Sequence, residues 1–288
     1  MTIISTIGMI FRSFFLSLSF LSRFCLDTEV YDPKDKIWKY YTIFYPLCAI
    51  IICIMPLLLS LFAPYLLNEK YLSEKALLTA LLSSIIYLST YYYITRAMHF
   101  DGFCDVADCL MAVGDKGKRL SALKDSNIGV GALCSGVLLL LFKFIILVAI
   151  FLSFNNELAF VFIAFSVIIS RSFVVLFSAT SKSIYKDNAN KNISFATLNL
   201  PQFRNFFIGL ILFTIPLATL ILFFFPKFWE LLKIYFFLAI LTQFILMSIV
   251  NNKAKKAIGG VNGDFLGYFI ELSEVSTLII PLIASHLL

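Results

Sequence analysis

Charged residues are scarce in this chain. Asp, Glu, Lys and Arg make up only 14% of its 288 residues, whereas 60% are hydrophobic and 32 are Phe. The mean hydropathy is +0.93. A soluble domain of this length could not cover its surface with so few charges. The composition therefore predicts a polytopic membrane protein. No polar segment is long enough for a second folded domain, so residues 1–288 are expected to form one integral membrane domain.

Metal-binding patterns of cysteine and histidine are also missing. The six Cys are scattered without a CxxC pair, and there are only two His. These counts argue against a zinc site and against a disulfide framework. The net charge of +6 is modest and is not gathered into a basic groove, so we expect no nucleic-acid partner. In a membrane protein, a basic excess reports topology and attraction to anionic lipid.

Long apolar runs are what the sequence does contain. A membrane-spanning helix needs about 20 predominantly apolar residues. The segments that meet this condition are approximately 41–62, 77–97, 132–154, 158–179, 206–226, 231–250 and 269–288. We therefore predict an all-α transmembrane bundle of about seven spans. The stretch 1–24 has Arg12 and Arg23 on its flanks but no small-residue cleavage site, which predicts a retained short helix that is interfacial or packed.

The polar loops between these spans fall into two alternating classes. Three are longer and basic: 98–131, 180–205 and 251–268. The others are short and nearly charge-balanced. By the positive-inside rule the basic loops face the cytoplasm, and the C-terminus lies on the other side. Few ionisable residues are expected within the spans. Lys143 could pair with a carboxylate or snorkel, and Arg171 could pair with an aspartate or reach a phosphate.

Three aspartates follow one another at helical spacing where the second predicted span ends. Asp101, Asp105 and Asp108 stand at i, i+4 and i+7, so on a helix their carboxylates share one face. Their mutual repulsion is costly unless a cation neutralises it, and hard oxygen ligands suit Mg²⁺ or Mn²⁺. Gly102 leaves room for a phosphate or metal, and His99 is a candidate base or local hydrogen-bonding group. The alternative is a solvated cap at the end of a span.

Two further polar clusters lie in the predicted cytoplasmic loops. Lys124–Gly131 combines a cation, a carboxylate, a hydroxyl and two glycines, which suits an anion at a helix start. Asp125 or Ser126 could equally be an ordinary N-cap. Gly259–Gly267 places four glycines around Asp264, followed by Glu271 and Glu274. These two glutamates could lie near the same site or simply complement the helix dipole. The basic loop 181–204 suits anion or lipid-headgroup contact without specifying either.

In three motifs the sequence resembles the cobalamin synthase family, the adenosylcobinamide-GDP ribazoletransferases. The family patterns H-x-D-G-x-x-D-x-x-D, K-D-S-x-x-G and G-G-x-x-G-D-x-L-G match His99–Asp108, Lys124–Gly129 and Gly259–Gly267. Ser19–Phe24 is also similar to the N-terminal F-L-T-R segment of that family, so the resemblance covers essentially the whole chain.

The chain departs from the family pattern at three positions. Cys109 stands where Gly usually follows the third aspartate, Asn127 stands where Arg is usual, and Asn262 replaces Thr. Asn127 removes one cation from the expected phosphate site, a loss that Lys124 could offset. None of the expected catalytic carboxylates is lost.

The resemblance implies an enzyme of the bacterial or archaeal cytoplasmic (inner) membrane, with Mg²⁺ as cofactor and an active site facing the cytoplasm. It would join adenosylcobinamide-GDP to α-ribazole or α-ribazole 5′-phosphate, giving adenosylcobalamin or its 5′-phosphate and GMP. Its partners would be these substrates and membrane lipid, and a homo-oligomer stays open.

The expected roles follow from this resemblance together with the residue chemistry. Metal binding is assigned to Asp101, Asp105 and Asp108, and catalysis to Asp101, Asp105, Asp125 and Asp264. Asp125 and Asp264 are further ligands or the general base. Substrate binding is assigned to Gly102, His99, Lys124, Ser126, Gly129, Gly260, Gly263 and Arg171, with Lys124 on the diphosphate.

Three other functions compete with this one. A membrane CDP-alcohol phosphotransferase would show D-G-x-x-A-R, but Asp105 and Val106 occupy the last two places. A prenyltransferase would need two separate aspartate-rich motifs, and only one comparable cluster is present. A cation transporter would place charged residues deep within its spans, whereas the polar clusters group in loops.

Overall fold

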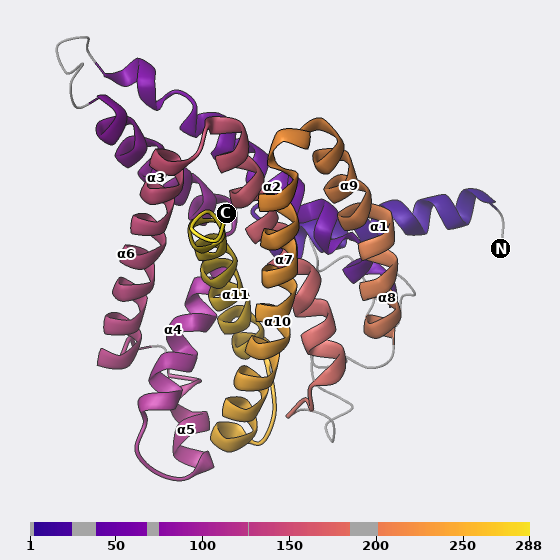
Figure 1. The fold of residues 1–288 in the computed structure, drawn as a ribbon. Coiled ribbons are helices and arrows are strands. Elements are labelled where there is room, and N and C mark those ends of the chain that lie inside the picture. The colour runs from indigo at the N-terminus through magenta and orange to yellow at the C-terminus, as the bar shows by residue number, and fades with distance from the viewer. Residues whose placement is uncertain (1–2, 25–38, 68–74, 126, 185–200) are drawn as a thin grey trace.

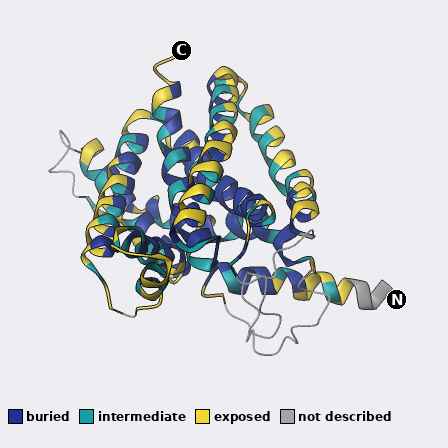
Figure 2. Cartoon of the chain, turned by 90° about the horizontal axis from the view of Figure 1, so that it is seen from below, coloured by how far each residue is buried: buried dark blue, intermediate teal, exposed yellow. Residues whose placement is uncertain are grey.

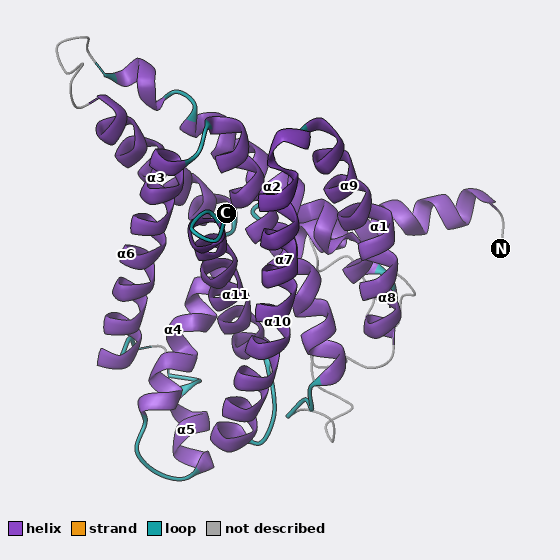
Figure 3. Cartoon of the chain, in the orientation of Figure 1, coloured by secondary structure: helices purple, strands orange, loops and turns teal. Residues whose placement is uncertain are grey.

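The computed structural model of the chain describes residues 3–24, 39–67, 75–125, 127–184 and 201–288 (Figure 1). The described residues form helices and no β-strand (Figure 3). The α-helices are α1 (Ile3–Leu21), α2 (Tyr45–Ser60), α3 (Lys75–Ile94), α4 (Met98–Met111), α5 (Lys116–Ala122), α6 (Val130–Ser153), α7 (Asn156–Thr180), α8 (Pro201–Gly209), α9 (Ile215–Phe224), α10 (Trp229–Ile258) and α11 (Gly263–Ala284). A π-helical turn at Leu210–Thr214 joins α8 to α9, and short 3₁₀ turns lie at Tyr41–Phe44, Ala63–Leu66 and Pro226–Phe228.

Among the described residues, seven helical segments are long and apolar enough to cross a membrane, which confirms the predicted bundle. They are Tyr41–Leu66, Lys75–Ile94, Val130–Ser153, Asn156–Thr180, Gln202–Phe224, Pro226–Ile258 and Gly263–Ala284. The predicted N-terminal helix is present as α1, which packs against α2 and buries Leu16 and Leu21.

The structure corrects two of the predicted loops. The predicted loop 98–131 is largely helical, because α4 and α5 occupy most of it. The predicted loop 251–268 shrinks to Gly259–Asn262. There α10 continues past 250 with Lys253, Lys255 and Lys256 exposed, and α11 begins at Gly263 rather than near 269. Asn262 fixes that start, since its side-chain oxygen accepts a hydrogen bond from the Phe265 backbone N–H.

Two helices form the centre of the bundle. In the most apolar stretch of α7, 89% of the residues are buried, compared with 11% in that of the segment Gln202–Phe224. The last helix, α11, packs against α4, α6, α7 and α10. Stacked rings of Phe177 and Phe269 join α7 to α11, with centroids 4.7 Å apart. Exposed apolar side chains cover the outer helices, as a bundle surrounded by lipid requires (Figure 2).

A tight turn separates α3 from α4. Arg96 and Ala97 have φ values of 56° and 51°, in the left-handed region that costs a non-glycine residue about 1–2 kcal/mol. The turn is held by hydrogen bonds from the Ala97 N–H to the Tyr92 carbonyl, 2.9 Å, and from the Met98 N–H to the Thr95 carbonyl, 3.2 Å. This turn ends the membrane span and starts α4 in a new direction.

Close backbone contact fixes α4 against α11. A Cβ atom added at Gly102 would lie 3.0 Å from the Asp264 Cα, and one at Gly267 would lie 3.0 Å from the His99 carbonyl oxygen. Small residues at such a crossing allow helices to approach closely. The contact brings the middle of the chain beside its C-terminal helix.

Candidate active site

The three aspartates lie on one helix, α4, as their spacing predicts. Asp101 is exposed, and Asp105 and Asp108 are half-buried. The opposite face of α4 is apolar and buries Phe103, Val106 and other side chains against the bundle. Burial and packing of that face therefore turn the carboxylates outward, towards the neighbouring polar segments.

Asp108 caps the start of α6. Its Oδ2 accepts a hydrogen bond from the Gly129 N–H at 2.7 Å, and its Oδ1 accepts one from the Ala132 N–H at 2.8 Å. Gly129 has to be small, because a Cβ there would lie 2.4 Å from Asp108 Oδ1. Gly129, rather than Asp125 or Ser126, is the N-cap residue of α6, so the carboxylate that caps this helix comes from α4. Metal binding by Asp108 stays a prediction.

Asp264 approaches the aspartates of α4 from the first turn of α11. Its Oδ2 accepts a hydrogen bond from Asn262 Nδ2 at 2.7 Å, which orients the carboxylate. Its backbone lies against Gly102, one residue from Asp101. Asn262 thus performs two tasks: it caps α11 and it holds Asp264 in place.

The charges of these carboxylates act on one another. Burial, together with the negative charges of Asp101, Asp264 and Asp108, raises the pKa of Asp105 from 3.8 to about 6. A divalent cation beside Asp105 would reverse this effect. In the described part of the chain, no three His, Cys, Asp or Glu side chains are grouped as a metal site. Mg²⁺ prefers oxygen ligands and commonly takes only one or two protein carboxylates, with water and phosphate oxygens completing its shell, so the neighbouring carboxylates of Asp101 and Asp105 are donors of a suitable kind.

A cavity of about 810 Å³ lies between α4 and α6. One wall is polar and carries Asp101, Asp105, Asp108, Asp125 and Asn127. The other wall is apolar and consists of Leu133, Val137 and Leu140, which share one face of α6 at i, i+4 and i+7. Gly136 completes the wall; a Cβ there would lie 3.0 Å from both Cys104 Sγ and Phe100 Cζ. Such a cavity suits a molecule with a charged part and a large apolar part.

The segment 124–129 contributes to this cavity in part. Asp125 and Asn127 line it, and Asp125 Oδ1 accepts hydrogen bonds from the Asn127 N–H, 3.0 Å, and from Asn127 Nδ2, 2.8 Å. Lys124 is exposed and is not among the lining residues. Ser126 lies outside the described residues. The assignment of Lys124 to a diphosphate stays a prediction.

The glycine-rich segment before α11 holds two loops together. Gly259 ends α10 with φ of 90°, a value that favours glycine. The Val261 N–H donates to the Lys182 carbonyl at 2.7 Å, and the Ile184 N–H donates to the Val261 carbonyl at 3.2 Å. Gly260 permits this contact, since a Cβ there would lie 2.5 Å from the Lys182 carbonyl oxygen. Gly263 has open space around its Cβ position.

An ion-pair cluster lies inside the bundle; a carboxylate partner for Lys143 was one of the expected alternatives, but Glu271 and Glu274 were not expected in that role. Lys143 Nζ is 2.5 Å from Glu271 Oε2 and 2.7 Å from Glu274 Oε2, and Arg171 pairs with Glu274 Oε1. All four side chains are at most 4% exposed. Tyr91 also contacts both Arg171 and Glu274. Lys143 is therefore the partner of carboxylates, and Arg171 pairs with a glutamate rather than with an aspartate.

Glu271 and Glu274 do not have the helix-dipole role that the sequence left open for them. Glu271 and Glu274 are two turns or more inside α11 and bind buried cations, so they do not serve as dipole-complementing charges at its start. One signal could have revealed the cluster: two cations within predicted spans require compensating charge, and an i, i+3 pair of glutamates was present to supply it.

His99 connects this cluster to the aspartates. It is buried in the first turn of α4, and its Nδ1 lies 3.4 Å from an Nη atom of Arg171. Burial, reinforced by the positive charges of Arg171 and Lys143, lowers the pKa of His99 well below its usual value. A neutral imidazole with so low a pKa is a weak base, and its position suits a hydrogen-bonding role. Substrate binding by His99 and Arg171 stays a prediction.

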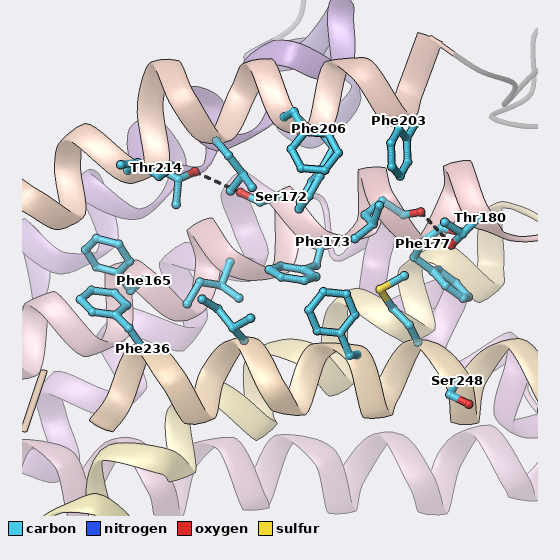
Figure 4. Close-up of a pocket in the computed structure, with 18 of the residues that line it drawn as sticks. Phe165, Ser172, Phe173, Phe177, Thr180, Phe203, Phe206, Thr214, Phe236 and Ser248 are labelled. Carbon is cyan, nitrogen blue, oxygen red and sulfur yellow. Dashed lines mark hydrogen bonds between the residues drawn. The ribbon is translucent and has the colours of Figure 1, made fainter. Parts of the chain in front are cut away.

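A second cavity, of about 950 Å³, is almost entirely apolar (Figure 4). It lies between α7, the α8–α9 segment and α10, and Phe165, Phe173, Phe206 and Phe236 are among its lining residues. Its few polar groups include Ser172 and Thr214, whose hydroxyl oxygens are 3.3 Å apart. It shares no lining residue with the cavity between α4 and α6, which is called the carboxylate cavity below.

Comparison with known proteins identifies the family. Residues 13–282 match the family model described as cobalamin-5-phosphate synthase. An adenosylcobinamide-GDP ribazoletransferase of Clostridium perfringens (strain SM101 / Type A) is 30% identical over 250 residues, covering 87% of this chain and 90% of the relative. One from Thermoanaerobacter sp. (strain X514) is 26% identical over 265 residues, covering 92% and 94%. No solved structure matches. The resemblance seen in the motifs is confirmed: the chain belongs to the cobalamin-5-phosphate synthase family and is a membrane-spanning transferase.

Proposed function

We propose that this chain joins adenosylcobinamide-GDP to α-ribazole or α-ribazole 5′-phosphate in a Mg²⁺-dependent reaction that releases GMP. The names of its relatives support the substrates. The observation that carries the chemistry is the meeting of Asp101 and Asp105 on α4 with Asp264 on α11 beside a half-apolar cavity. Neighbouring carboxylates that repel one another are unfavourable on their own and favourable beside a cation and a diphosphate.

The reaction is the transfer of a substituted phosphoryl group to an alcohol. A ribose hydroxyl oxygen of α-ribazole attacks the phosphorus that carries the aminopropanol arm of the corrinoid. The bond from that phosphorus to the bridging oxygen breaks, GMP leaves with the electron pair, and the hydroxyl proton passes to a carboxylate. Asp125 and Asp264 are the two candidates for this proton acceptor. In reactions of this type, positioning and electrostatic stabilisation contribute most of the rate.

Asp101 and Asp105 are the residues that would hold Mg²⁺. When bound, the ion neutralises charge on the diphosphate and stabilises the leaving oxygen. A hydrogen bond from Asn262 orients Asp264, and Asp108 caps the start of α6, so both carboxylates have defined directions. The apolar face of α6 forms the other side of the cavity.

We also propose a cytoplasmic orientation for this site. The exposed cations Lys116, Lys118, Lys255 and Lys256 belong to α5 and the end of α10, which lie together at the end of the bundle near α4 (Figure 1). The positive-inside rule favours the cytoplasm for that end, where nucleotide substrates are available.

The test is direct. Purified protein is incubated with adenosylcobinamide-GDP, α-ribazole and Mg²⁺, and GMP and the corrinoid product are separated by chromatography. Asp105→Asn should lose turnover by at least about 100-fold, as expected when a charged group that stabilises the transition state is removed. Asp115→Asn is the matched control, because Asp115 caps α5 away from the cavity and Asn caps equally well. No GMP from the unaltered protein, or equal turnover in the two variants, would refute the proposal.

A further inference from the structure

Arg96 stands at the mouth of the carboxylate cavity. It occupies the left-handed turn between α3 and α4 and is exposed. Arg96 is one of the residues that line the cavity, together with Asp101, Asp105 and Asp108. Sequence analysis assigned it no role, because nothing in the spacing of the aspartate motif shows which way a residue before that motif points.

Arg96 is the single Lys or Arg among the residues that line this cavity. Within the described part of the chain, its guanidinium forms no ion pair or hydrogen bond. Four carboxylates line the same cavity, yet none of them binds it. The guanidinium is therefore available to an anionic ligand. Asp108 and Asp125 already accept hydrogen bonds, from the start of α6 and from Asn127, which leaves Asp101 and Asp105 for a cation.

The backbone explains why the side chain is placed there. Two successive residues in the left-handed region reverse the chain at Arg96 and Ala97, and the Asp101 N–H donates to the Ala97 carbonyl at 2.8 Å. The turn is therefore tied directly to the first aspartate. Neither residue is glycine, so the strained conformation is maintained by the surrounding structure.

We propose that Arg96 binds the phosphate groups of the nucleoside-diphosphate substrate, an inference that rests on the proposed function. The planar guanidinium matches two phosphate oxygens at once, which a lysine ammonium does not. Lys124, assigned to this task from the sequence, does not line the cavity, and Asn127 in the lining is uncharged. Arg96 supplies the positive charge that this wall otherwise lacks.

Binding of GDP in the presence of Mg²⁺, measured by isothermal titration calorimetry in detergent, tests the inference without turnover. Arg96→Gly removes the guanidinium and suits the left-handed turn, so the variant is expected to fold. We expect its affinity for GDP to fall by about 10- to 100-fold, the effect of losing charge-assisted hydrogen bonds to phosphate. Arg96→Lys should recover part of the loss. Lys256→Ala removes an exposed cation from the end of α10 and should bind GDP like the unaltered protein.

The steady-state constants separate a binding role from a general structural one. Arg96→Gly should raise KM for the GDP-carrying substrate and leave KM for α-ribazole unchanged. Equal rises in both constants, unchanged GDP affinity, no GDP binding by the unaltered protein, or a larger loss in Lys124→Ala would each overturn the inference. If the unaltered protein binds GDP through Arg96 yet forms no corrinoid product, the proposed function fails and the phosphate site stands.

Discussion

Replacing Glu274 with glutamine isolates the energetics of the buried ion-pair cluster. Glu274 binds both cations: Lys143 Nζ lies 2.7 Å from one carboxylate oxygen, and Arg171 pairs with the other. Arg171 has no exposed surface, and Glu274 is its only carboxylate partner among the described residues. Leaving one buried charge unpaired typically costs about 3–5 kcal/mol. We therefore expect Glu274→Gln to lower the free energy of unfolding by about that amount.

Glu271→Gln provides the matched comparison. Glu271 and Glu274 lie one turn apart on α11, and either substitution leaves one uncompensated positive charge. After Glu271→Gln, however, Lys143 keeps its contact with Glu274 and Arg171 keeps its own. The expected loss is smaller, about 1–3 kcal/mol, as for a buried hydrogen bond to a charged group.

Unfolding in mixed micelles of dodecyl maltoside and SDS, followed by circular dichroism, gives both free energies. The double variant Arg171→Met, Glu274→Gln should regain part of the stability, because an apolar side chain replaces the unpaired charge. The reasoning is wrong if Glu271→Gln proves the more damaging single change, or if Glu274→Gln costs less than about 1 kcal/mol.

Two further predictions concern the walls of the carboxylate cavity. Asp108→Ala should destabilise the protein by about 1–2 kcal/mol and reduce GMP release, because the start of α6 loses its cap; unchanged unfolding would contradict the two hydrogen bonds assigned to Asp108. Gly136→Leu should abolish turnover while a matched lipid-facing change, Leu138→Ile, leaves it intact, because the new side chain meets Cys104 and Phe100 at the cavity wall. Full activity in Gly136→Leu would show that substrate does not use this cavity.

Local sequence signals were enough to predict the membrane spans and the common helix face of the three aspartates. Apolar length predicts a membrane helix directly, and the i, i+4, i+7 spacing of Asp101, Asp105 and Asp108 determines their common face once α4 is helical. The meeting of Asp264 with these residues depends instead on the crossing of α4 and α11 through Gly102 and Gly267. Backbone proximity between helices so far apart in sequence leaves no periodic signal.

The glutamate partners of the two buried cations, Lys143 and Arg171, were not predicted from the sequence. The sequence predicts few charges within the spans, whereas the structure places Lys143, Arg171, Glu271 and Glu274 there. Two positive and two negative charges pair within the cluster, so each buried cation has a carboxylate partner. The place of Arg96 could not be predicted for a different reason. It lies in a strained left-handed turn, and a left-handed conformation cannot be predicted from the sequence when the residue is not glycine.

The distance in sequence between the buried charges has a consequence for biosynthesis. Arg171 precedes Glu274 by 103 residues, and Lys143 precedes Glu271 by 128. At roughly 5–20 residues per second, the ribosome needs on the order of 5–25 s to deliver the missing carboxylates. During that interval the nascent chain holds two cations in helices destined for the membrane interior without their counter-ions. The ion pairs of the third and fourth membrane helices can therefore form only after the seventh has been translated.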